Sequence, residues 1–145
     1  VFDKPVLFFE NGETKKINAQ YESRKNKWPK FPPTSCISFR KKNLRSVIKK
    51  VFNSDYPDLW IDFRLASFFT IKKKQFNLLN NYLTFYRQSE TSYDKRYNKF
   101  LNVAWWRRRN QAFDFINQID KKNTEKYQTF DYFLTRFINR LFSIF

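Results

Sequence analysis

Two tryptophans followed by three arginines, Trp105-Trp106-Arg107-Arg108-Arg109, are the side chains of this sequence best suited to binding chemistry. Guanidinium groups bind phosphate in a bidentate manner, and both guanidinium and indole planes stack on unpaired bases. Adjacent residues of a helix point about 100° apart, so one tryptophan can enter the core while the other stays beside the arginines. We interpret Trp106, Arg107, Arg108 and Arg109 as contacts to phosphates and bases. The alternative is a core tryptophan pair beside a solvated run of charge.

Residues for catalysis or metal binding are scarce. The sequence has no His, one Gly and one Cys. These counts exclude the Ser-His-Asp and Cys-His systems, the glycine-rich phosphate and dinucleotide loops, and cysteine metal clusters built on Cys36. Asp55, Asp58 and Asp62 surround Pro57 and are the one acidic group that can hold Mg²⁺ for phosphodiester cleavage; a turn acid and a strand acid paired with nearby cations are the alternative. We expect no enzyme activity, cofactor or metal.

The charge balance indicates a polyanionic partner. Lys and Arg number 29 and Asp and Glu 13, which gives a net charge of +16. Domains usually keep their net charge within single digits, and nucleic acid is the commonest partner that offsets such an excess, followed by an anionic membrane. Residues 1–50 hold 13 basic and 4 acidic side chains, and residues 51–145 hold 16 and 9, so the charge is spread along the chain. We predict further RNA contacts at the basic residues Arg24, Lys25, Lys27, Lys30, Arg40, Lys41, Lys42, Arg45, Lys49, Lys72, Lys73 and Lys74.

The elements that must position these residues indicate an α+β fold. Asn11-Gly12 between the runs 6–10 and 13–18 predicts a hairpin with a type I′ turn, because that turn needs positive φ at both central residues. The basic, proline-rich stretch 19–35 predicts an extended arm, with a surface linker as the alternative. We therefore divide the chain into the hairpin and arm, residues 1–35, and one α+β RNA-binding domain, residues 36–145.

Hydrophobic periodicity predicts the remaining elements. We expect a strand at 36–39, a helix at 41–56, a strand at 59–71, helices at 76–86 and 93–119, a turn at 121–124 and a C-terminal helix from 130, capped by Thr129 or Gln128.

The apolar stripe of the C-terminal helix comprises Phe130, Phe133, Leu134, Phe137, Ile138, Leu141 and Ile144. We expect this stripe to pack in the core; a membrane surface and the groove of a partner protein are the alternatives. No apolar run reaches eighteen residues, so we expect no transmembrane segment. The N-terminal residues lack the pattern of a secretory signal.

The composition resembles that of proteins encoded in AT-rich protist mitochondrial DNA, especially that of ciliates. Residues with A/T-rich codons dominate, among them 19 Phe, whereas Gly and Ala are scarce. Several such proteins are divergent ribosomal proteins with basic arms and helices. The resemblance implies a structural constituent of a mitochondrial ribosome in the matrix, bound to rRNA and neighbouring ribosomal proteins and without a small-molecule substrate.

Two other functions stay open. One is a membrane-peripheral accessory subunit of a mitochondrial respiratory complex, docked on anionic lipid through the C-terminal helix. The other is a nuclease or RNA-processing enzyme that uses the region Asp55–Asp62.

Overall fold

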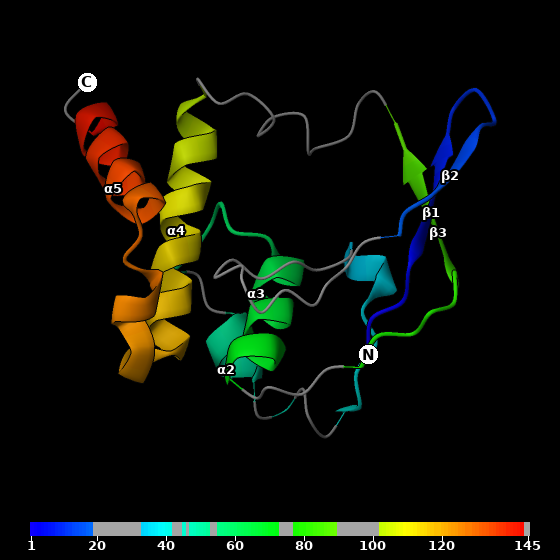
Figure 1. Ribbon diagram of the computed structural model, residues 1–145, viewed down its shortest axis with the longest axis horizontal. Coiled ribbons are helices and arrows are strands. Elements are labelled where there is room, and N and C mark those ends of the chain that lie inside the picture. Colours follow the sequence, from blue (N-terminus) through cyan, green and yellow to red (C-terminus); the bar gives the residue numbers. More distant parts are fainter. Residues whose placement is uncertain are drawn as a thin grey trace. The chain divides into compact units, whose positions relative to one another are not determined.

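The computed structural model describes residues 1–18, 33–41, 45, 47–52, 55–72, 77–89 and 102–143. The chain divides into two compact units, one of Val1–Asn53 with Ile61–Ser92 and one of Ser54–Trp60 with Tyr93–Phe145. A small mixed sheet lies in the first unit and the C-terminal half is helical, so the predicted α+β class is confirmed (Figure 1). The division differs from the predicted boundary at residue 35, because the hairpin pairs with a strand far along the chain. Residues 19–32 of the predicted arm lie outside the described residues.

The predicted hairpin is confirmed, but its turn is of another kind. Strand β1 (Pro5–Phe9) pairs antiparallel with β2 (Thr14–Lys16). The Gly12 amide donates to the Phe9 carbonyl (3.0 Å), and the Phe9 amide donates to the Glu13 carbonyl (2.9 Å). These bonds close a three-residue loop in which Gly12 has φ 84°, instead of a two-residue type I′ turn. Glycine is needed here because it takes positive φ without steric cost.

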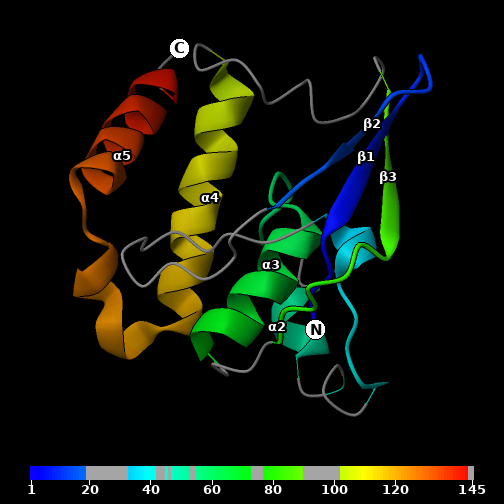
Figure 2. The same ribbon diagram turned by 45° about the vertical axis from the view of Figure 1, so that its right-hand side comes forward.

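A third strand completes the sheet in the order β2-β1-β3 (Figure 2). Strand β3 (Thr84–Gln88) is parallel to β1, with register from Pro5↔Thr84 to Phe9↔Gln88. The predicted helix at 76–86 is therefore wrong, since residues 77–83 are not helical and 84–86 belong to this strand. Its apolar spacing suits a helix, but β1 offers a hydrogen-bonding edge that local periodicity cannot reveal.

Short helical segments occupy the region in which we predicted a strand at 36–39 and a helix at 41–56. The 3-10 turn η1 (Thr34–Cys36) ends at the first residue of the predicted strand at 36–39, and within that stretch Ile37 makes a single bridge to Phe2. The predicted helix at 41–56 contains α2 (Ile48–Val51), whose helical hydrogen bonds end at Phe52. Residues 42–44, 46 and 53–54 are not described.

The predicted strand at 59–71 is wrong. The structure has helix α3 (Ile61–Ser67) followed by a π-helical turn, η2 (Phe68–Lys72). The five successive residues 63–67 are all buried, so this helix is surrounded on several sides. A short helix of that kind shows no clear polar face, and alternation of apolar residues does not distinguish it from a strand.

The second unit contains two longer helices, and a capping side chain marks where each begins. Helix α4 (Val103–Ile119) begins at Asn102, whose side chain accepts from the Ala104 amide (2.9 Å). After η4 (Lys121–Tyr127), helix α5 (Phe130–Phe142) begins at Thr129, whose hydroxyl accepts from the Tyr132 amide (3.3 Å). The end of α4 and the Thr129 cap were both predicted, because capping chemistry is local. The predicted start of this helix near residue 93 is wrong, because Asn102 has an extended backbone and the helix begins after it; residues 93–101 lie outside the described residues.

Aromatic residues form much of the core of the second unit. Tyr56 packs edge-on against Phe115 at 5.5 Å between ring centroids, and its hydroxyl bonds to the Gln118 side chain at 3.2 Å. Burial extends along α4 and into η4, at Trp106, Ala112, Phe113, Phe115, Ile116, Ile119 and Tyr127.

We predict that Gly12→Ala lowers the free energy of unfolding by about 1 kcal/mol. A Cβ at Gly12 meets no atom within 4 Å, so the cost arises from the backbone conformation alone. Urea unfolding measures it. Gly12→Asn is the control and should lose less, because Asn tolerates positive φ. Equal losses for the two variants would contradict this account.

Candidate nucleic-acid interface

The structure assigns different environments to the two tryptophans of the Trp-Arg segment on α4. Trp106 is only 3% exposed, whereas Trp105 is half-buried, and the two rings meet edge to face at 4.7 Å. A buried ring offers no face to a base, so Trp106 is not available for the stacking that we expected of it. Trp105 is the indole that stays beside the arginines.

The three arginines of the segment also differ. Arg107 is exposed to solvent. The Arg108 guanidinium lies over the Trp60 ring, 4.2 Å from its centroid. Arg109 forms an ion pair with Asp131, its Nε donating to Oδ1 at 3.1 Å, and lies 5.1 Å from the Trp105 centroid. Arg108 and Arg109 therefore make contacts inside their own unit, and Arg107 is the member of the segment placed for an external phosphate.

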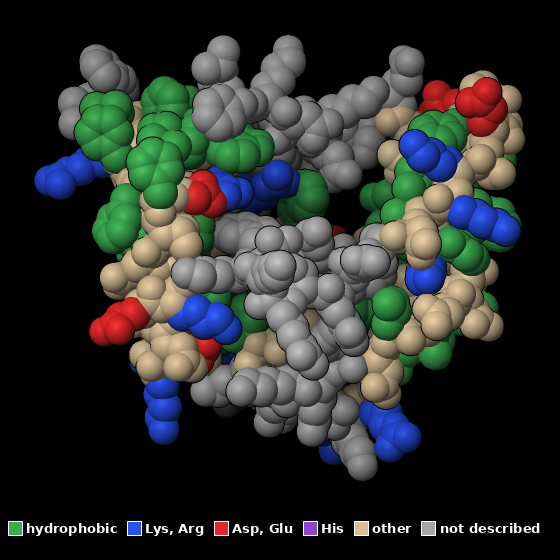
Figure 3. Space-filling model, viewed as in Figure 1, with side chains coloured by type: hydrophobic (Ala, Val, Ile, Leu, Met, Phe, Trp, Pro, Cys, Tyr) green, Lys and Arg blue, Asp and Glu red, His purple; other side chains and the backbone are tan. Residues whose placement is uncertain are grey.

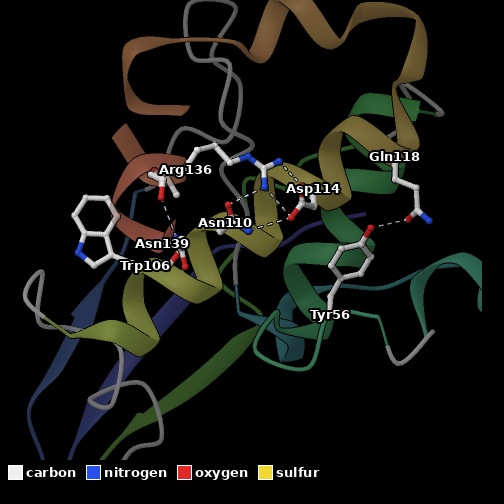
Figure 4. Close-up of polar contacts among 8 residues, drawn as sticks. Tyr56, Trp106, Asn110, Asp114, Gln118, Arg136 and Asn139 are labelled. Carbon is white, nitrogen blue, oxygen red and sulfur yellow. Dashed lines mark hydrogen bonds and ion pairs between the residues drawn. The ribbon is translucent and has the colours of Figure 1, made fainter. Parts of the chain in front are cut away.

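Polar side chains join α4 to α5 (Figure 4). Arg136 forms an ion pair with Asp114 and also donates to the Asn110 amide oxygen at 2.8 Å. Burial alone lowers the pKa of Arg136, but the hydrogen bonds and charge of Asp114 and Tyr132 outweigh burial and raise it. The Asn139 amide donates to the Trp106 carbonyl at 2.8 Å. The polar side of α5 thus packs against α4.

The apolar stripe of α5 is consequently exposed, and the prediction that it packs in the core is wrong for four of its residues. Phe130, Phe133, Phe137 and Leu141 are exposed, Phe137 by 61%, whereas Thr135 on the opposite side is fully buried. Figure 3 shows hydrophobic side chains gathered over this helix. Leu134 and Ile138 are half-buried, and Ile144 lies outside the described residues.

The predicted basic contacts of the first unit are exposed wherever the structure describes their side chains. These are Arg40, Lys41 and Arg45. Lys50, which we did not include, is exposed on the same segment. The side chains of the remaining predicted contacts lie outside the described part of the chain: Arg24, Lys25, Lys27, Lys30, Lys42, Lys49, Lys72, Lys73 and Lys74.

The acidic group does not form a metal site in the part of the chain that the structure describes. Asp58 accepts from the Gln111 side chain at 3.1 Å, and Asp62 accepts from the Thr34 hydroxyl at 3.1 Å. Among the described residues, no cluster of three or more His, Cys, Asp or Glu is placed to hold an ion.

The outer face of the sheet is a further candidate that the sequence analysis missed. Phe8 on β1 and Phe85 on β3 are both exposed there, together with Lys16 and Arg87. The alternation of exposed and half-buried residues at 84–88 is the signal that marks this face, but it is visible only once 84–88 is known to be a strand.

No protein family, curated protein or solved structure matches this chain. Over the described residues, none of the helices combines the length and the apolar character needed to cross a bilayer.

We predict that Arg109→Ala lowers the free energy of unfolding by about 1 kcal/mol, because it removes a partly exposed ion pair and a cation–π contact. Arg107→Ala is the matched control and should change stability by less than about 0.5 kcal/mol, as expected for a solvated side chain. Urea titration of both variants gives the comparison. A larger loss for Arg107→Ala than for Arg109→Ala would contradict the assignment of roles.

Proposed function

We propose that this protein is a structural, non-catalytic constituent of a mitochondrial ribosome that binds rRNA. The observation that carries the proposal is the net charge of +16 together with exposed basic side chains in both units. An rRNA phosphate backbone offsets such a charge and releases counterions on binding. The composition, which resembles that of proteins encoded in ciliate-type mitochondrial DNA, supports the ribosome and the matrix as its location.

Contacts of this kind position the protein along the backbone and do not read sequence. In the first unit they fall to Arg40, Lys41 and Arg45, and in the second to Arg107. Basic side chains on separate segments suit RNA helices packed around a protein. No cofactor or small-molecule substrate enters this function.

Replacing Arg40, Lys41 and Arg45 together with Ala should weaken rRNA binding and reduce the slope of log K against log salt by about two to three. Each lost phosphate contact removes somewhat less than one released counterion. Filter binding of an rRNA transcript over a series of salt concentrations measures the slope.

The control removes the same charge from another place. Lys121, Lys122 and Lys126 are exposed on η4 and are not predicted contacts, so their triple Ala variant should leave the slope nearly unchanged. Equal slopes for both triple variants would refute specific contact by the first set.

In mitochondrial extracts, the protein should co-sediment with ribosomal particles and leave them at high salt.

One observation favours a second function, a membrane-peripheral subunit of a respiratory complex. The exposed stripe of α5 presents three phenylalanines and Leu141, and Arg140 is exposed on the same helix. A helix with this pattern can lie in the interface of an anionic bilayer with its aromatic side inserted.

For this second function, the double variant Phe133→Ser/Phe137→Ser should reduce binding to phosphatidylcholine–phosphatidylglycerol vesicles by at least about tenfold for each ring. Co-sedimentation with the vesicles measures the partition. Phe85→Ser is the control and should bind as the wild type does, because it removes an exposed phenylalanine that lies on the sheet and not on α5. Absence of wild-type binding to the vesicles would exclude this function.

A further inference from the structure

The sheet presents two aromatic rings and two cations on one face. Paired residues of neighbouring strands point to the same side, so the register places Lys16, Val6 and Phe85 in one row and Thr14, Phe8 and Arg87 in the next. Phe8 and Phe85 are therefore diagonal neighbours, with Cα atoms about 8 Å apart by strand geometry.

The opposite face of the sheet is the covered one. The Thr84 hydroxyl points to that side and donates to the Ser35 carbonyl of η1 at 3.5 Å. Leu7 and Tyr86 share this side and are half-buried. The side of Phe8 and Phe85 is thus the outer face of the first unit.

The two rings on the outer face are both exposed to solvent. Phe85 is 71% exposed and Phe8 41% exposed, although Val6 between Lys16 and Phe85 is buried. Exposed aromatic surface is costly in water, so adjacent exposed rings mark a surface that a partner covers.

The charges of this face indicate the chemical class of the partner. Lys16 and Arg87 are both exposed, one in each row. The ammonium groups of Lys16 and Lys4 lie 5.3 and 5.9 Å from the centroid of the Tyr82 ring. These cation–π contacts place both cations at the same end of the face. Glu10 and Glu13 lie at the hairpin turn and bound the face at the other end. An apolar protein surface would offer no negative charge to these cations. A nucleic acid strand offers phosphates to the cations and aromatic bases to the two rings.

We propose that this face, with Phe8 and Phe85 as stacking platforms and Lys16 and Arg87 as phosphate contacts, binds an unpaired segment of RNA. The proposal rests on the proposed RNA-binding function and adds a site that the basic residues alone do not indicate. Bases of a single strand can turn outward and stack on a flat sheet, whereas the bases of a duplex are already stacked inside it.

The experiment measures binding of a fluorescent oligouridine and of a hairpin duplex of the same length to the whole protein. Phe85→Leu and Phe8→Leu should each weaken oligouridine binding roughly tenfold and leave duplex binding unchanged. The slope against salt should stay as in the wild type, because no charge is removed. Phe85→Trp should bind as the wild type does, since it keeps an aromatic face at this position.

Phe137→Leu is the matched control and should bind as the wild type does, because Phe137 is an exposed phenylalanine on α5 whose exposure lies between those of Phe8 and Phe85. Because the altered side chains are exposed, circular dichroism and the unfolding midpoint should not change. Photo-crosslinking of 4-thiouridine RNA should map to the peptides that carry Phe8 and Phe85.

The possible outcomes separate the two proposals. Wild-type affinity of Phe8→Leu and Phe85→Leu for oligouridine would overturn the stacking platform while leaving the RNA-binding function intact. Failure of the wild type to bind either RNA would overturn both. Equal loss of oligouridine and duplex binding in the two variants would also overturn the platform, because stacking on unpaired bases cannot produce it.

Discussion

The parallel pairing of β1 with β3 is the interaction on which the first unit depends. As the central strand, β1 must satisfy backbone groups on both of its edges, and β2 provides partners on one edge only. The register with β3 decides which side chains face outward. A slip of one residue would turn Phe85 and Arg87 towards η1 and bring Thr84 and Tyr86 to the outer face. The aromatic and basic surface therefore depends on this register.

The second unit depends on a different kind of contact. Its two long helices meet through Arg136, Asp114 and Asn139, and through the fully buried Thr135. The partly exposed ion pair contributes little by itself, whereas the Asn139 amide satisfies a backbone carbonyl and fixes the rotation of α5. That rotation turns the phenylalanines outward. Two of the three consecutive arginines of α4 are likewise held within the unit, by Asp131 and Trp60.

Both units thus leave aromatic surface open, and the two surfaces differ in their surroundings. The sheet face combines two rings with cations in each row, which suits a partner that carries both charge and bases. The stripe of α5 is more uniformly apolar, with Arg140 beside it and Arg136 engaged by Asp114. In the proposed function, RNA covers the sheet face and a neighbouring protein covers the stripe of α5.

The amino-acid sequence by itself determined the features whose chemistry is complete within a few residues. Gly12 marks the hairpin turn, and Thr129 begins α5. The net charge of +16 is likewise a property of the sequence, and the polyanionic partner that it predicts belongs to the proposed function. Only the tertiary structure decided that 61–67 is helical, that 84–88 is a strand, and that Trp106 is buried while Arg107 is exposed. The partner of β3 lies 79 residues earlier in the chain, and the buried side of α5 is set by polar groups on α4. Such choices depend on contacts between distant segments, which hydrophobic periodicity along one segment does not contain.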